Sequence, residues 1–242
     1  MEYFSITVVG SLIVLAASFI RRDRDKYPAV CVAVMLPVFS VLMCIPLRIV
    51  SALHPHTVDA LLYRVDLAMG LNPVAVFQFV QRTPWLKTLV DIVYFGLPLP
   101  VAIGQALERP RVMLRAMILA SVIAACVCYN LGPAVGPVFA LADPMGSNLQ
   151  WLADPGVGAR NCFPSMHLGC ALLLAWNLRG RVLKLCAWVY VALTALATIG
   201  TGQHYFIDLI AAVPFCWAIQ TVAEMPKLAV PQFAWEKEEA RL

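Results

Sequence analysis

Charged residues are scarce in this chain of 242 residues. Only 13% of them are Asp, Glu, Lys or Arg, whereas 61% are hydrophobic. Soluble domains carry about 25% charged residues, and their interiors grow only slowly with chain length. A water-soluble globule of this size cannot bury so much apolar surface. The composition therefore excludes a soluble enzyme, a disordered chain and a fibrous repeat, and it indicates a membrane protein that spans the bilayer several times.

Other features are missing as well. The sequence has no C-x-x-C pair, internal repeat or low-complexity tract, and no basic face interleaved with aromatic residues. These absences argue against a zinc or disulfide framework and against a nucleic-acid partner. Seven of the eight cysteines fall in apolar runs, and we expect Cys162, on a loop, to have no nearby partner.

Long apolar runs divide the chain into helices. A bilayer core of about 30 Å requires about 20 apolar residues per helix. Seven spans are predicted on this basis: 4–20, 28–50, 85–107, 112–131, 164–178, 183–201 and 205–222. Residues 51–84 contain Asp59, Arg64, Asp66 and Arg82, which favours a position along the membrane interface. We therefore expect an all-α bundle with an N-terminal extra helix and basic loop (1–27), a six-helix catalytic domain (28–222) and a cytoplasmic tail (223–242).

Basic residues are distributed unevenly between the loops. If the N-terminus lies outside, 13 of the 18 Lys and Arg residues fall on the cytoplasmic side. This asymmetry follows the positive-inside rule and predicts a multi-pass protein of the cell (inner) membrane.

Two histidines occur in polar stretches at the ends of predicted spans. The first stretch is Arg160-Asn161-Cys162-Phe163-Pro164-Ser165-Met166-His167. Pro164 and Ser165 suit the start of a helix, and Ser165 can cap its first turn. The free N–H groups there favour an anion, and the guanidinium of Arg160 is suited to phosphate oxygens.

The second stretch is Gly200-Thr201-Gly202-Gln203-His204-Tyr205-Phe206-Ile207-Asp208. We expect His204 and Asp208 to lie one turn apart on one helix face, so that the carboxylate accepts the histidine N–H and fixes its tautomer. The other ring nitrogen would then be free to attack. Both stretches open helices that run inward, so we expect His167, His204 and Asp208 to meet at the non-cytoplasmic face in a site for a phosphorylated ligand.

The pair F-P-S-M-H and H-Y-F-I-D resembles two motifs of the type 2 phosphatidic acid phosphatase superfamily, and most of all its inositol phosphorylceramide synthase branch. Weaker similarity runs through Asp59…Asp66…Gly70, through Asp91-x-x-Tyr94 and through Pro133-Ala134-Val135-Gly136-Pro137. The resemblance implies a metal-independent phosphoryl transfer without a cofactor. In this scheme His204 is the nucleophile that becomes a phosphohistidine, Asp208 orients it, and His167 protonates the leaving oxygen. Substrate contacts would come from Arg160, Asn161, Ser165, Gln203, Tyr205, Asp91 and Tyr94.

Two departures from that family favour headgroup transfer to a lipid alcohol. Ala197 and Thr198 stand where phosphatase members have a Ser-Arg pair, and Ala102 stands where their K-x6-R-P motif has its lysine. The resulting expectation is a phosphorylated lipid donor with a lipid or water acceptor. Four alternatives stay open: a lipid-phosphate or polyisoprenyl-diphosphate phosphatase, a lipid transporter, a serine hydrolase built on Ser165, and a metal site. The sequence does not predict the oligomeric state.

Overall fold

The computed structural model describes residues 8–16, 27–108, 111–156 and 158–225, and the regular elements within these ranges are helices. Residues 8–16 are helical. The following helices are α2 (Tyr27–Leu53), α3 (Asp59–Ala68), α4 (Pro73–Arg82), α5 (Pro84–Phe95), α6 (Pro98–Glu108), α7 (Arg111–Ile123), the π-helical turn η1 (Ala124–Cys128), α8 (Tyr129–Leu131), α9 (Pro137–Ala140), α10 (Met166–Asn177), α11 (Arg181–Gly200) and α12 (Phe206–Glu224).

The all-α membrane bundle is confirmed. Within the described ranges, three helices are long and apolar enough to cross a membrane: Val112–Leu131, Arg181–Gly200 and Phe206–Glu224. The number rises to five if each of two bent helix pairs counts as one span. Helices suit this setting because they satisfy every backbone hydrogen bond internally.

A short helix lies at the centre of the bundle. α10 packs against α7, α11 and α12, and Leu173 and Leu174 in it are almost fully buried. It has 12 residues, which corresponds to about 18 Å at 1.5 Å per residue. The expected span 164–178 is thus represented by a helix shorter than the bilayer core. The expected span 85–107 is also altered, because α5 and α6 meet at a bend of 52°.

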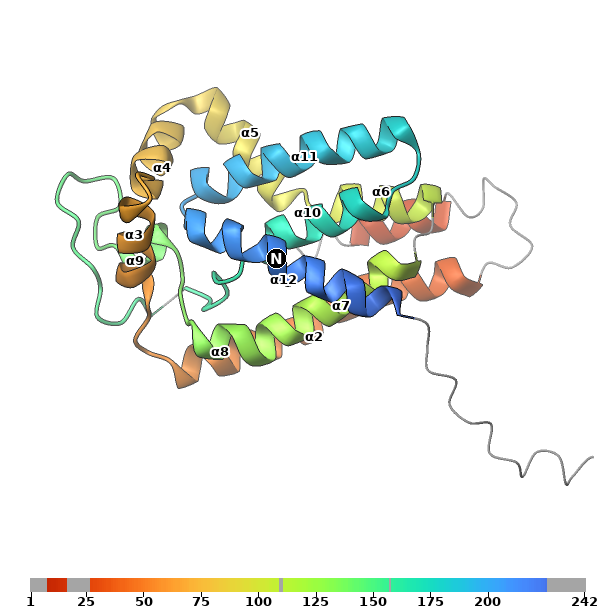
Figure 1. The fold of residues 1–242 in the computed structure, drawn as a ribbon, viewed down its shortest axis with the longest axis horizontal. Coiled ribbons are helices and arrows are strands. Elements are labelled where there is room, and N and C mark those ends of the chain that lie inside the picture. The colour runs from red at the N-terminus through yellow and green to blue at the C-terminus, as the bar shows by residue number, and fades with distance from the viewer. Residues whose placement is uncertain (1–7, 17–26, 109–110, 157, 226–242) are drawn as a thin grey trace, which may run out of the picture.

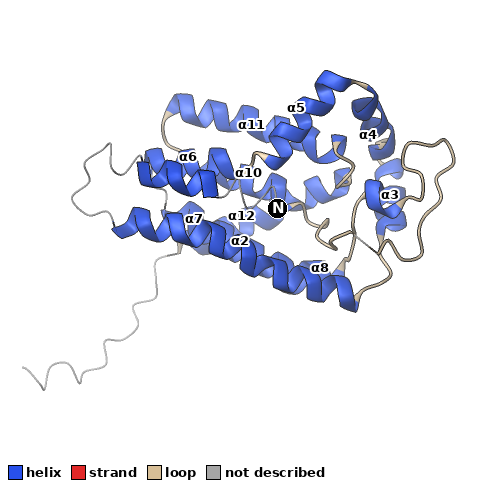
Figure 2. Cartoon of the chain, turned by 180° about the vertical axis from the view of Figure 1, so that it is seen from behind, coloured by secondary structure: helices blue, strands red, loops and turns tan. Residues whose placement is uncertain are grey.

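The segment expected at the interface forms one end of the bundle. α3 and α4 pack beside α9 and the loops there, with a bend of 95° between them (Figure 1). The view from behind also shows α3 and α4 at one end of the bundle, beside the loops (Figure 2). Asp59 and Asp66, whose charges suggested an interfacial location, are instead buried inside the protein. The sequence interpretation missed that both carboxylates accept hydrogen bonds from other parts of the protein.

Parts of three sequence predictions lie outside the described residues. These parts are the ends of the first span 4–20, most of the basic loop 21–27 and the tail beyond residue 225. Arg109 and Pro110, which match the R-P of the K-x6-R-P motif that Ala102 interrupts, lie outside them as well. Within the described part, Val14 packs against Ala102 and Ala106 of α6. Ala102 therefore contributes to the packing of the N-terminal helix.

Candidate functional site

The first histidine stretch enters α10 through a capped turn. Ser165 is the N-cap, and its Oγ accepts a hydrogen bond of 3.5 Å from the N–H of Leu168. The expected role of Ser165 as a cap is confirmed. This cap places His167 in the first turn of α10, at the same end of the bundle as the loop between α11 and α12 (Figure 1).

The second stretch differs from the expected helix face. α12 begins at Phe206, so His204 precedes the helix and stands before its N-cap Tyr205. Asp208 forms a capping box, in which its Oδ2 accepts the N–H of Tyr205 at 2.7 Å. This turn still brings His204 Nδ1 to 3.4 Å from Asp208 Oδ2. The i,i+4 contact is therefore correct, but a capping turn produces it.

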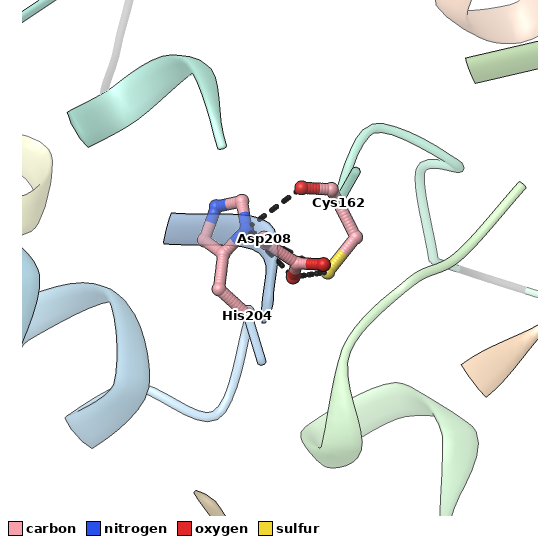
Figure 3. Close-up of side chains that lie close together, drawn as sticks. All are labelled: Cys162, His204 and Asp208. Carbon is pink, nitrogen blue, oxygen red and sulfur yellow. Dashed lines mark hydrogen bonds and ion pairs between the residues drawn. The ribbon is translucent and has the colours of Figure 1, made fainter. Parts of the chain in front are cut away.

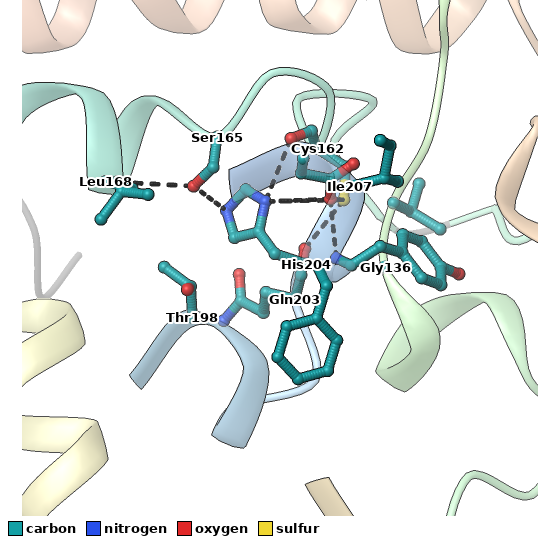
Figure 4. Close-up of polar contacts among 12 residues, drawn as sticks. Gly136, Cys162, Ser165, Leu168, Thr198, Gln203, His204 and Ile207 are labelled. Atoms are coloured by element: carbon teal, nitrogen blue, oxygen red, sulfur yellow. Dashed lines mark hydrogen bonds and ion pairs between the residues drawn. The ribbon is translucent and has the colours of Figure 1, made fainter. Parts of the chain in front are cut away.

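The surroundings of His204 assign its tautomer. Nδ1 lies 3.0 Å from the carbonyl oxygen of Cys162, which can only accept a hydrogen bond. Nδ1 must therefore carry the hydrogen in the neutral ring, which leaves a lone pair on Nε2. Nε2 points to the other side of the ring, 3.4 Å from Ser165 Oγ (Figure 4). The ring is 3% exposed, so this orientation is fixed by packing as well as by hydrogen bonds.

His167 lies beside His204. The two ring centroids are 5.9 Å apart and the rings are inclined by 65°. Tyr94 stacks on His167 with a centroid distance of 3.9 Å, and its hydroxyl donates to Gln203 Oε1 at 3.0 Å. This bond holds the amide of Gln203, the residue before His204, through its oxygen. The structure thus brings together residues from α5, α10 and the loop before α12.

Cys162 is a site residue that the sequence interpretation missed. It was expected to have no partner, but its Sγ is 2.7 Å from Asp208 Oδ2 and 3.1 Å from the carbonyl oxygen of Gln203 (Figure 3). Burial, together with the nearby charges of Asp208 and Asp59, raises the pKa of the Cys162 thiol well above its ordinary value. The thiol therefore stays protonated and can donate to the carboxylate. No pattern in the sequence around Cys162 signals this contact.

Asp59 and Asp66 hold the loop around His204 in place. Asp59 accepts hydrogen bonds from the N–H of Gly136 at 2.8 Å and from the hydroxyl of Tyr205 at 2.9 Å. Asp66 accepts from the N–H groups of Phe206 and Ile207 at 2.7 and 2.9 Å. The first amides of α12 are therefore occupied by Asp66 and are not open to a ligand anion. The weak Asp59…Asp66 resemblance was the one sequence signal for these roles.

Gly136 lets two loops approach each other closely. Its φ of +86° is in the left-handed region, and a Cβ added there would lie 2.4 Å from the backbone of Gln203. Only glycine fits both conditions. The loop that contains Gly136 therefore packs directly on the residue before His204.

Arg160, the candidate phosphate ligand, makes all its contacts within the protein. The guanidinium of Arg160 is buried and donates to the carbonyls of His54, Pro55, Gly156 and Gly158 and to Asp154, all of which lie in the surrounding loops. Arg160 thus holds these loops together, and a role as phosphate ligand receives no support from its contacts.

Tyr205 is fully buried and its hydroxyl is occupied by Asp59. Asp91 pairs with Lys87 on a partly exposed face of α5, and Asn161 lines a cavity with His167.

Three of these side chains could also hold a metal ion. Cys162, His204 and Asp208 offer sulfur, nitrogen and oxygen donors within 4.8 Å of one another, and all three residues are buried. This donor set suits a zinc-type ion. Hydrogen bonds among these three residues also explain why their donor atoms lie close together. The geometry is therefore compatible with metal binding and with hydrogen bonding alone.

The family model of the PAP2 superfamily matches residues 60–222, which is more than half of the chain and includes both histidine stretches. No curated protein and no solved structure matches the chain. The matched region begins in α3 and ends in α12, so it also includes Asp66 and the glycine loop at Gly136. The chain belongs to the PAP2 superfamily.

Proposed function

We propose that this protein transfers a phospho-headgroup from a phosphorylated lipid to a lipid alcohol through a phosphohistidine on His204, as in the inositol phosphorylceramide synthase branch. Membership of the PAP2 superfamily indicates a phosphatase or phosphotransferase that acts on phosphorylated lipids. The observation that carries the proposal is the orientation of His204. Its Nδ1 is held by the Cys162 carbonyl and by Asp208, and its Nε2 lies 3.4 Å from Ser165 Oγ, in the turn that leads to His167.

The proposed reaction has two steps. His204 Nε2 attacks the phosphorus, the bond from phosphorus to the lipid oxygen breaks, and His167 gives its proton to that oxygen. An acceptor hydroxyl then loses its proton to His167 and attacks the phosphorus, and the bond to His204 breaks. Asp208 stabilises the positive charge that His204 gains, and the amide of Gln203 can donate to a phosphoryl oxygen.

The acceptor decides between transferase and phosphatase. Purified protein would be incubated with a radiolabelled phospholipid donor, with and without ceramide as the lipid alcohol. The proposal expects label to enter a new lipid when the alcohol is present. Release of free phosphate that ceramide does not change would instead support the alternative, a lipid-phosphate or polyisoprenyl-diphosphate phosphatase that uses water.

Substitution of the nucleophile separates an enzyme from a lipid transporter. His204→Ala should abolish turnover and leave the protein folded in the membrane. His56→Ala is a matched control, since His56 is exposed and bonds the carbonyl of Ala153. Full activity of His204→Ala would overturn the assignment of the nucleophile. Activity that survives a strong chelator would remove the metal alternative.

A serine hydrolase is the second candidate, because Ser165 Oγ, His204 and Asp208 follow one another at 3.4 Å each. Ser165 is fully buried and already caps α10. The glycines that open space around a hydrolase serine are missing from Pro-Ser-Met. A fluorophosphonate that traps activated serines tests this candidate. Labelling of Ser165 would favour the hydrolase.

A further inference from the structure

A cavity lies beside His167, toward α2. Its volume is about 140 Å³, and its wall includes Met43 and Leu47 of α2, Ala125 of η1, and Met166 and His167 of α10. Most of this wall is apolar, and His167 is its one histidine. The cavity thus joins a hydrocarbon-like surface to a group with a central role in the proposed reaction.

The geometry of the phosphoryl transfer determines which part of a substrate faces this wall. In an in-line displacement, the attacking and leaving groups stand on opposite sides of the phosphorus. His204 Nε2 is the attacking atom, so the leaving oxygen is on the side of His167, which protonates it. The carbon skeleton bonded to that oxygen therefore extends past His167. The acceptor alcohol must enter along the same path, because His167 removes its proton in the second step.

The wall contains small residues where a chain would need room. Ser121 of α7 and Ala125 of the π-helical turn line the cavity, and π-turns commonly mark functional sites within helices. Leu47 is half-buried and faces the cavity from α2. α2 ends at Leu53, before the region that matches the PAP2 superfamily begins at residue 60. This side of the cavity is therefore contributed by a segment outside the family match.

We infer that the cavity holds the hydrocarbon chain of the lipid alcohol, first as leaving group and then as acceptor, and that Leu47 and Ala125 limit which chains fit. This inference rests on the proposed function, since it uses His167 as the acid and base. The ligand is the apolar part of a lipid alcohol. The polar headgroup would stay on the side of His204.

Photolabelling tests the position of the chain without turnover. The His204→Ala variant, in nanodiscs of phosphatidylcholine, would be irradiated with a phosphatidic acid that carries a diazirine near the glycerol end of one acyl chain. We expect labelled peptides to contain Met43, Leu47 or Ala125, and an excess of dioleoyl phosphatidic acid to remove the label. Label confined to Leu42 and Ile49, which are exposed on α2, or label that this competitor leaves unchanged, would overturn the inference.

Filling the cavity tests its selectivity. Ala125→Leu should lower the ratio of kcat/KM for dioleoyl over dihexanoyl phosphatidic acid about tenfold or more, because the longer chain needs more of the space. Leu47→Trp provides a second variant on another helix, in case one of them fails to fold. Val127→Leu is the matched control, since Val127 is exposed on the same π-turn.

The two experiments distinguish a failure of the chain site from a failure of the proposed function. Specific photolabel in the cavity, together with a wild-type protein that shows no turnover, would contradict the proposed function and leave the chain site standing. Turnover through His204 with an unchanged chain-length ratio in both filled variants would contradict the chain site and leave the proposed function standing.

Discussion

At the scale of single residues, the site depends on which atoms surround the His204 ring. The Cys162 carbonyl can only accept, so it holds Nδ1–H and leaves the lone pair on Nε2, the atom proposed to attack. The Cys162 thiol contributes differently, because it donates to the buried carboxylate of Asp208. One loop residue thus acts on both the ring and the carboxylate that orients it.

Removal of the thiol should slow the reaction without changing substrate binding. In Cys162→Ala, Asp208 loses a hydrogen bond of about 1–2 kcal/mol. We expect kcat to fall about tenfold with little change in KM, because Cys162 positions Asp208 and does not touch substrate. Cys162→Ser restores a donor and should recover most of the rate.

Steady-state kinetics on both variants check this role. A Cys162→Ser variant as slow as Cys162→Ala would contradict positioning through a hydrogen bond and indicate that only the shape of the thiol matters. A wild-type rate in both variants would show that Asp208 needs no help from residue 162.

At the scale of elements, the loops and helix ends fix where the histidines lie. Asp66 occupies the first amides of α12, and Asp59 joins the Gly136 loop to Tyr205. These contacts connect α3 to residues far along the chain. The end of the bundle formed by α3 and α4 therefore supports the site directly.

Substitution of Gly136 should damage the site more than a comparable glycine elsewhere. Gly136→Ala adds backbone strain of about 1–3 kcal/mol and a clash with Gln203. Gly156→Ala is the control that adds backbone strain without a clash, because Gly156 also has a positive φ but has nothing within 4 Å of an added Cβ. We expect Gly136→Ala to lower the unfolding midpoint further and to lose most activity. If Gly136→Ala and Gly156→Ala changed the unfolding midpoint and the activity equally, the close contact between residue 136 and Gln203 would be contradicted.

At the scale of the whole molecule, the sequence predicts a bundle with one polar active end. Long apolar runs specify helices, since the bilayer leaves the backbone few other choices. The meeting of His167 with His204 also follows from helix direction alone. The burial of Asp59 and Asp66 could not be predicted, because their donors are contributed by residues more than 70 positions away. The bend between α5 and α6 and the shortness of α10 likewise depend on packing, which a hydropathy count does not contain.

The uneven loop charges predict that the site faces away from the cytoplasm. The test uses a variant without the exposed cysteines Cys44, Cys126 and Cys186, with one new cysteine at a time. A membrane-impermeant maleimide added to intact cells should label Ala153→Cys, in the exposed loop before α10, and leave Arg181→Cys unlabelled until the membrane is opened. The reverse pattern would place the site on the cytoplasmic face.

The central claim is that His204 carries the phosphoryl group between donor and acceptor. The most direct measurement is to mix the enzyme with ³²P-labelled phospholipid, quench at alkaline pH within the first turnover, and locate the label by mass spectrometry of the digested protein. We expect label on His204 in the wild-type protein, none in His204→Ala, and loss of that label when acceptor lipid is added before the quench. Turnover without any label on His204, or label on another residue, would contradict the account.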